Sequence, residues 1–141
     1  MMASAARLYG ETAFPATPAR SLAWRDCLNR LRHVALECRS ASHADLFETC
    51  ARLANQPTVP GDVFARAFFR CVRQSTGTQP IMFRPGVAEI SFDEAWLMRA
   101  IVAADNDHDS FAFLIRSRIP KQDQRNIAFL INGISASFVR I

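Results

Sequence analysis

Three aspartates alternate with other residues in the segment Asp105-Asn106-Asp107-His108-Asp109. Their spacing matches positions one, three and five of a calcium-binding loop, where acidic side chains bind the ion. Position six of such a loop needs a glycine and position twelve a bidentate glutamate, but the sequence has Ser110 and Arg116 there. We therefore expect an acidic connection between two helices, with its carboxylates capping the second helix.

Four cysteines and three histidines could supply zinc ligands, and the best set in the sequence is Cys27, His33, Cys38 and His43. Zinc ligands usually include a close pair, such as two cysteines separated by two residues, and this set has none. Cys27 and Cys38 fall on one predicted helix, which separates their Cα atoms by about 16 Å. The sequence therefore predicts no metal and no cofactor, and the cysteines are expected to be buried, reduced thiols.

Catalytic motifs are missing from the 141-residue sequence: it contains no G-x-S-x-G, H-E-x-x-H or C-x-x-C pattern and no glycine-rich phosphate loop. Its histidines, cysteines and acids could form a site from distant positions, but nothing in their order selects a set. We therefore expect a protein that is not an enzyme.

Almost all of the positive charge is arginine, with sixteen arginines and one lysine. Arg66, Arg70 and Arg73 are spaced four and three residues apart, which places them on one helix face with no acid between them. Arginines in such a row can bind carboxylates or phosphates bidentately. With Arg84 in the following loop they form the candidate binding site for a protein or an anion; the alternative is a solvated helix face.

A second arrangement of polar residues suggests a helix-turn-helix-like unit that binds DNA. Two predicted helices between Asp109 and Ile131 are joined by a short turn at Arg118-Ile119-Pro120. Polar residues at the start of the second helix are of the types that read base edges or hold phosphates. The candidate nucleic-acid-binding residues are Arg116, Arg118, Lys121, Gln122, Gln124, Arg125 and Asn126. The turn lacks the glycine often found there, and Asp123 would repel phosphate.

We expect helices to position the candidate binding residues, because apolar side chains recur at steps of three and four along most of the chain. The sequence predicts an all-α fold, a single domain of about six helices in an orthogonal or bundle-like arrangement, with a long irregular loop at about 74–90. Helix starts are expected near Pro18, Asp45, Asp62, Ser91, Asp107 or Asp109, and Lys121.

Three sequence features within these predicted elements lead to further predictions. Ser91 and Glu94 form a capping box that opens a helix over about 91–104, and that helix is apolar on most sides, which predicts the central helix of the fold. Gly133 is expected to kink or end the last helix. In the long loop, Ile81, Met82 and Phe83 are expected to dock on the core, whereas Arg84-Pro85-Gly86 suits a tight turn.

Composition sets the class of protein. Half of the residues are hydrophobic and the net charge is +4, with a pI of about 9.3, which fits a folded domain and permits anionic partners. We expect residues 1–17 to form a flexible tail and residues 18–141 a single helical domain. Neither a secretory signal nor a membrane-spanning stretch is apparent, so a cytoplasmic location is predicted.

The sequence as a whole favours a non-enzymatic helical binding or regulatory protein that meets another protein through its arginines. A DNA-binding regulator that uses the helix from Lys121 is one alternative, and a small-ligand sensor with an aromatic-lined cavity near Trp96 is another. A homodimer would bury apolar residues that lie off the main helix stripes, namely Phe69, Phe113 and Phe129.

Overall fold

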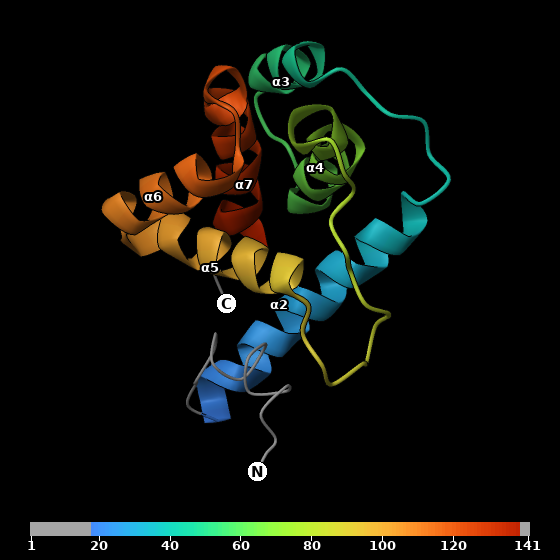
Figure 1. Cartoon of the computed structure of the whole chain (residues 1–141), viewed down its shortest axis with the longest axis vertical. Coiled ribbons are helices and arrows are strands. Elements are labelled where there is room, and N and C mark those ends of the chain that lie inside the picture. Colours follow the sequence, from blue (N-terminus) through green and yellow to red (C-terminus); the bar gives the residue numbers. More distant parts are fainter. Residues whose placement is uncertain (1–17, 139–141) are drawn as a thin grey trace.

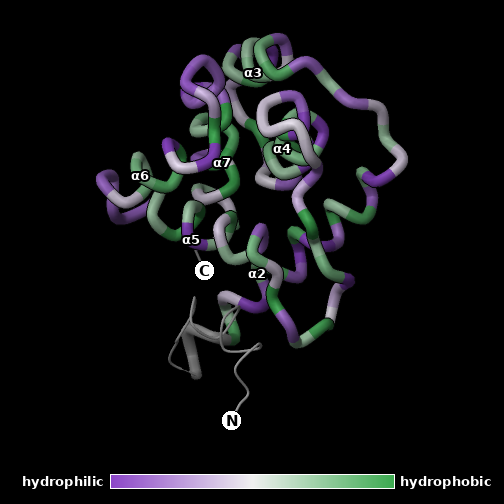
Figure 2. The backbone as a smooth tube through the Cα atoms, viewed as in Figure 1, coloured by the Kyte–Doolittle hydropathy of each residue, from purple (hydrophilic) through white to green (hydrophobic). Residues whose placement is uncertain are grey.

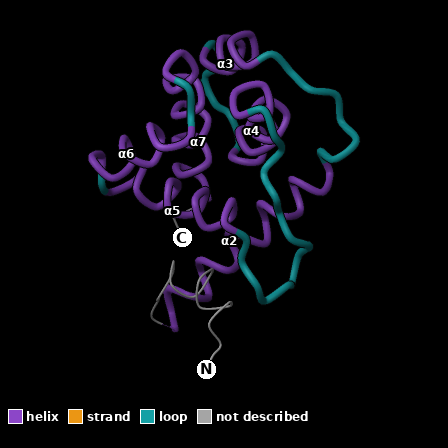
Figure 3. Tube along the Cα trace, viewed as in Figure 1, coloured by secondary structure: helices purple, strands orange, loops and turns teal. Residues whose placement is uncertain are grey.

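The structure, a computed structural model, describes residues 18–138 and is all-helical in that range (Figures 1 and 3). A 3-10 turn at Lys121–Asp123 leads into the last of six α-helices. The helices are α2 (Pro18–Glu37), α3 (Leu46–Ala54), α4 (Gly61–Thr76), α5 (Phe92–Asn106), α6 (His108–Arg118) and α7 (Gln124–Phe138). The predicted fold class is therefore confirmed, whereas the predicted tail at 1–17 lies outside the described residues.

Helix α7 forms the centre of the molecule. It packs against α3, α4, α5 and α6, and five of its apolar side chains are buried completely: Ile127, Leu130, Ile131, Ile134 and Phe138. Helix α5 packs mainly against α6 and α7. The prediction that α5 is the central helix was wrong. A helix that is apolar on most sides is expected to be buried, but its sequence does not show how many other helices pack against it.

Two glycines allow α4 and α7 to approach closely. A Cβ atom at Gly133 of α7 would overlap the ring of Phe64 on α4, and one at Gly61 of α4 would meet the ring of Phe138 on α7 at 2.9 Å. The expectation that Gly133 ends α7 was wrong, since the helix continues to Phe138. This glycine instead makes room for a neighbouring ring.

Helix starts depend on local side chains and mostly follow the sequence. Ser91 and Glu94 form the predicted capping box, and the side chains of Asp45 and Asp107 cap α3 and α6. Helix α4 is the exception, since Pro60 is its N-cap and no side chain caps it. The predicted cap Asp62 instead pairs with Arg30 of α2 at 3.5 Å.

Hydrophobic residues are concentrated where the helices meet, whereas the connection between α5 and α6 is hydrophilic (Figure 2). Within residues 18–138, no helix combines the length and the hydropathy needed to span a bilayer.

Candidate binding cleft

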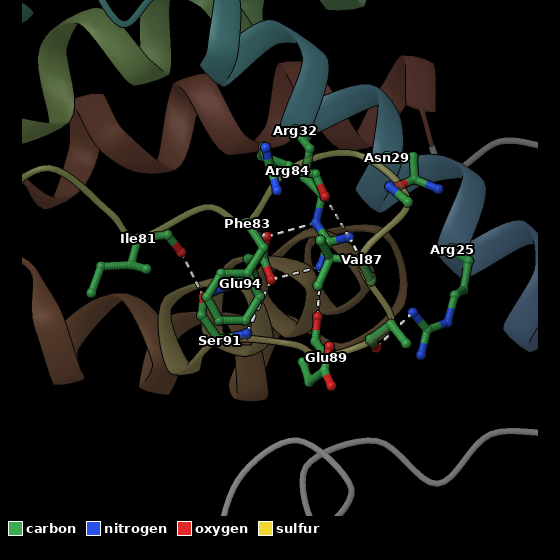
Figure 4. A network of polar contacts seen from close by, with 12 residues as sticks. Arg25, Asn29, Arg32, Ile81, Phe83, Arg84, Val87, Glu89, Ser91 and Glu94 are labelled. Carbon is green, nitrogen blue, oxygen red and sulfur yellow. Dashed lines mark hydrogen bonds and ion pairs between the residues drawn. The ribbon is translucent and has the colours of Figure 1, made fainter.

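An ion pair in the interior holds the long loop between α4 and α5. Arg32 of α2 and Glu94 of α5 are both buried, with Nε to Oε2 at 2.7 Å and Nη2 to Oε1 at 2.9 Å (Figure 4). The remaining donors of Arg32 reach loop carbonyls, at 2.8 Å to Val87 and Glu89 and 3.4 Å to Arg84. Every N–H of this guanidinium is therefore used within the chain.

Glu94 holds the same loop from the other side. Its carboxylate accepts the backbone N–H groups of Phe83 at 2.8 Å and Ser91 at 3.0 Å, in addition to the arginine. The Ser91 hydroxyl donates to the carbonyl of Ile81, and Asp93 accepts the N–H of that residue. The loop consequently has a defined path without any secondary structure of its own.

The predicted turn at Arg84-Pro85-Gly86 is confirmed. Val87 N–H donates to the Arg84 carbonyl at 3.2 Å, and Gly86 has a φ of 90°, as a type II turn requires at its third residue. Asn29 of α2 accepts the N–H of Gly86 at 3.0 Å. Together with the Arg32 network, these bonds fix the loop against α2.

The fixed loop forms one wall of an open cleft of about 450 Å³, within the range of ligand-binding pockets. The C-terminal end of α2 with the residues that follow it forms a second wall, and α4 forms the floor. Figure 3 shows the two long irregular segments, 38–45 and 77–91, on the same side of the molecule. We call this hollow the arginine cleft because four exposed or half-buried arginines line it: Arg39, Arg70, Arg73 and Arg84.

Two of these arginines are oriented by neighbours. Arg70 donates from Nε to the carbonyl of Ser42 at 3.0 Å, and Nη1 of Arg73 lies 3.3 Å from Nε2 of His43, which also lines the cleft. Within residues 18–138, none of the four cleft arginines forms an ion pair. Their positive charges therefore remain available to a ligand.

Among residues 18–138, no acidic residue lines the cleft. The two nearest acids along the chain have other partners: Glu37 pairs with Arg66 at 3.8 Å, and Asp45 accepts from Glu48 N–H and from the Gln74 side chain. The described lining of the cleft is consequently positive, with Asp45 beside His43 and Arg73 in a shallow neighbouring hollow.

Apolar side chains form the inner surface and part of the rim of the cleft. Phe69 is buried in the floor and Met82 packs partly against the core. Leu36 and Ile81 line the cleft with 44% and 61% of their surface exposed. The expectation that Ile81 docks on the core was wrong, because its backbone is held by Ser91 and Asp93 while its side chain faces solvent. The cleft therefore offers both charge and apolar surface.

Two side chains of the cleft could take part in nucleophilic chemistry, the Cys38 thiol and the His43 imidazole. Among the described residues that line the cleft, Cys38 is the only one with a hydroxyl or thiol group, and burial raises its pKa, with Arg66 and Arg70 opposing the shift. A thiol that holds its proton is a poor nucleophile. In the described part of the chain, the lining holds no carboxylate that could act as a base or orient His43 for that role.

The structure brings together three of the four predicted binding residues. Arg70, Arg73 and Arg84 line one cleft, although Arg84 follows Arg73 by eleven positions and belongs to a different element. Arg66 does not line it and forms an exposed ion pair with Glu37. The sequence did not predict that Arg39 and His43 belong to this binding site. The only indication was that both are basic residues in the segment between two predicted helices.

The predicted DNA-binding residues lie on three elements: the last turn of α6, the 3-10 turn that follows it, and the first turn of α7. The apolar face of α7 is enclosed by α3, α4, α5 and α6. Arg118 pairs with Asp93 and stacks on Trp96, and Gln124 donates to the carbonyl of Ile119 at 2.9 Å. Asn126 is half-buried at the start of α7. Arg118 is exposed in spite of its ion pair, and Arg116, Lys121, Gln122 and Arg125 are exposed as well.

A second hollow of about 240 Å³ lies on the other side of the loop, and Pro80 lines both hollows. Trp96 is part of its wall, together with the Arg118–Asp93 ion pair. The indole N–H donates to the carbonyl of Leu114 at 3.0 Å. In the part of the chain that the structure describes, no group of three His, Cys, Asp or Glu side chains is arranged to hold a metal.

Comparisons of this chain with protein-family models, with curated proteins and with solved structures find no match. The geometry of the cleft is therefore the basis for assigning a function.

Proposed function

We propose that this chain is a non-enzymatic binding protein that takes an acidic segment of a partner protein into the arginine cleft. The observation that carries the proposal is the set of Arg39, Arg70, Arg73 and Arg84 around an apolar surface, with no acid among the lining residues that the structure describes. Planar guanidinium groups bind carboxylates bidentately, and several together give specificity for an acidic ligand.

The apolar residues favour a protein ligand over a nucleic acid. Leu36 and Ile81 are exposed beside the arginines, and a peptide can cover them with its own apolar side chains while a phosphate backbone cannot. The four cysteines are free thiols, which supports a reducing compartment, and we place the protein in the cytoplasm.

The cleft is also prepared for binding. The Arg32–Glu94 network fixes one wall, and Ser42 and His43 hold two arginines in place. A ligand therefore meets a surface that is already ordered, which lowers the entropic cost of association.

Fluorescence anisotropy with a short labelled peptide of aspartate and leucine tests the proposal. We expect binding that weakens as salt screens the charges, and that the charge reversal Arg73→Glu/Arg84→Glu weakens about tenfold or more. Reversal of two exposed arginines outside the cleft, Arg116→Glu/Arg125→Glu, changes the net charge equally and should leave the affinity within about twofold. Equal losses in both variants would show that only net charge matters, and would refute the proposal.

The same variants examine the DNA-binding alternative. If the protein acts on DNA through the helix from Lys121, labelled duplex DNA should bind with steep salt dependence, and Arg116→Glu/Arg125→Glu should abolish that binding. Under the proposal made here, neither variant shows specific binding to the duplex.

A further inference from the structure

A second patch of the same molecule has the chemistry that the arginine cleft accepts. Residues 105–110, between the end of α5 and the first turn of α6, are all exposed, and we call them the acidic corner. It contains Asp105, Asp107 and Asp109, and Asp107 caps α6 through Ser110 at 3.1 Å. Neither Asp105 nor Asp109 forms an ion pair within residues 18–138.

An exposed aromatic side chain accompanies these acids. Phe113 follows Asp109 by four residues on α6, so both lie on one helix face, and 62% of its surface is exposed. His108 lies within the corner, between Asp107 and Asp109, whereas the nearest arginines along the two helices, Arg99 and Arg116, are about two turns from the aspartates next to the connection. The corner is thus a projecting acidic surface with an apolar neighbour.

The corner and the cleft cannot meet within one molecule. The connection between α5 and α6 lies at the left edge of Figure 1, whereas the C-terminal end of α2 and the loop that form the cleft lie at the right. Contact between the two surfaces therefore requires two copies of the chain.

We propose that the acidic corner of a second copy of this chain occupies the arginine cleft, joining molecules head to tail. The proposal rests on the proposed function, since it names the source of the acidic segment. Asp105 and Asp109 would face the four cleft arginines, and Phe113 would cover the apolar rim at Leu36 and Ile81. Because the two surfaces differ, the contact is heterologous and builds rings or open chains instead of a closed two-fold dimer.

Sedimentation velocity on the full chain tests this arrangement. The wild type should form species larger than a monomer as its concentration rises, and these should dissociate when salt is added. Two variants, each folded by circular dichroism, remove one surface each: Arg73→Glu/Arg84→Glu in the cleft and Asp105→Lys/Asp109→Lys in the corner. Each alone should be monomeric, whereas Asp26→Lys/Glu48→Lys, which reverses two exposed acids elsewhere, should assemble like the wild type.

Mixing the two variants gives the decisive result. One retains a cleft and the other a corner, so an equimolar mixture should form a heterodimer and nothing larger. A mixture that stays monomeric, or single variants that assemble as well as the wild type, would overturn the second copy as the occupant. If the acidic peptide still binds the wild-type cleft in that case, the proposed function stands; if the peptide also fails to bind, both proposals fall.

Discussion

Arg32 connects three separate parts of the chain through one side chain. Its guanidinium pairs with Glu94 and also holds the carbonyls of Arg84, Val87 and Glu89, so α2, the long loop and α5 meet at a single buried group. Arginine suits this position because its planar fork offers five donors in fixed directions. A lysine could not reproduce this set.

Arg32→Met should lower the free energy of unfolding by about 3–5 kcal/mol, because it leaves the Glu94 carboxylate buried without its partner. Urea denaturation measures the change. Arg66→Met is the control, since it removes an exposed ion pair with Glu37 and should cost at most about 1 kcal/mol. Similar small losses in both variants would show that the buried pair contributes little.

Hydrogen exchange should separate the effect of Arg32→Met on the loop from its effect on the whole fold. Amides in residues 81–91 lose the anchor that fixes them to α2, so they should exchange faster than the amides of α7 at matched stability. Uniform acceleration across the chain would contradict a specific role in holding the cleft wall.

The cysteines provide a second test, on the reactivity of individual side chains. Burial raises the pKa of Cys27 to about 12 and of Cys50 to about 11, and it raises those of Cys38 and Cys71 as well. Cys38 is the only one of the four that is not buried. Iodoacetamide should therefore modify one thiol in the native protein, and Cys38→Ser should remove that product in mass spectra.

The rate of this modification should rise with pH, because the thiolate reacts and a raised pKa keeps its fraction small near neutrality. An acidic peptide bound in the arginine cleft should slow the reaction, since Cys38 lines that cleft. Modification of two or more thiols in the folded protein, or a rate insensitive to the peptide, would count against the assigned burial or the assigned site.

At this level the sequence predicted which arginines share a helix face better than it predicted their partners. Arg70 and Arg73 were found because helical spacing places them on one face, and that periodicity is local. Arg32 was not singled out from the sequence, because it lies off the apolar stripe of α2 and its partner Glu94 is 62 residues away. Spacing along one helix carries no information about a contact of that kind.

The helices themselves were largely predictable because their signals are local. Ser91 and Glu94 satisfy each other's backbone N–H groups. The Asp107 side chain caps α6 by accepting the N–H of Ser110, three residues later. The path of the loop at 77–91 could not be predicted, because it is set by bonds to α2 and α5 and not by its own residues.

Gly133→Ala should destabilise the protein, although alanine normally stabilises a helix interior by about 1 kcal/mol relative to glycine. The added Cβ overlaps the Phe64 ring, so we expect a loss of about 1–3 kcal/mol in urea denaturation. Asn132→Ala, at the exposed neighbouring position, should change little. The cost of Gly133→Ala should shrink in a Phe64→Leu background, and an unchanged cost would show that this ring is not the obstacle.

The molecule as a whole should unfold in one step, because α7 contributes to the core beneath α3, α4, α5 and α6. Trp24 on α2 and Trp96 on α5 allow a direct test, since Trp24→Phe and Trp96→Phe each leave one reporter in a different helix. Their fluorescence transitions in urea should coincide with loss of the far-UV circular dichroism signal. Transitions at different urea concentrations would show that α2 unfolds separately.

The central position of α7 also bears on how the chain folds during its synthesis. Helices α2 to α6 precede α7 in the sequence, yet α7 supplies the surface that covers much of their apolar faces. At about 5–20 residues per second, a ribosome exposes the earlier helices for several seconds before α7 emerges. During that interval the apolar residues that α7 covers, such as Phe64 beside Phe129, lack this cover, so the core can be completed only after α7 has been synthesised.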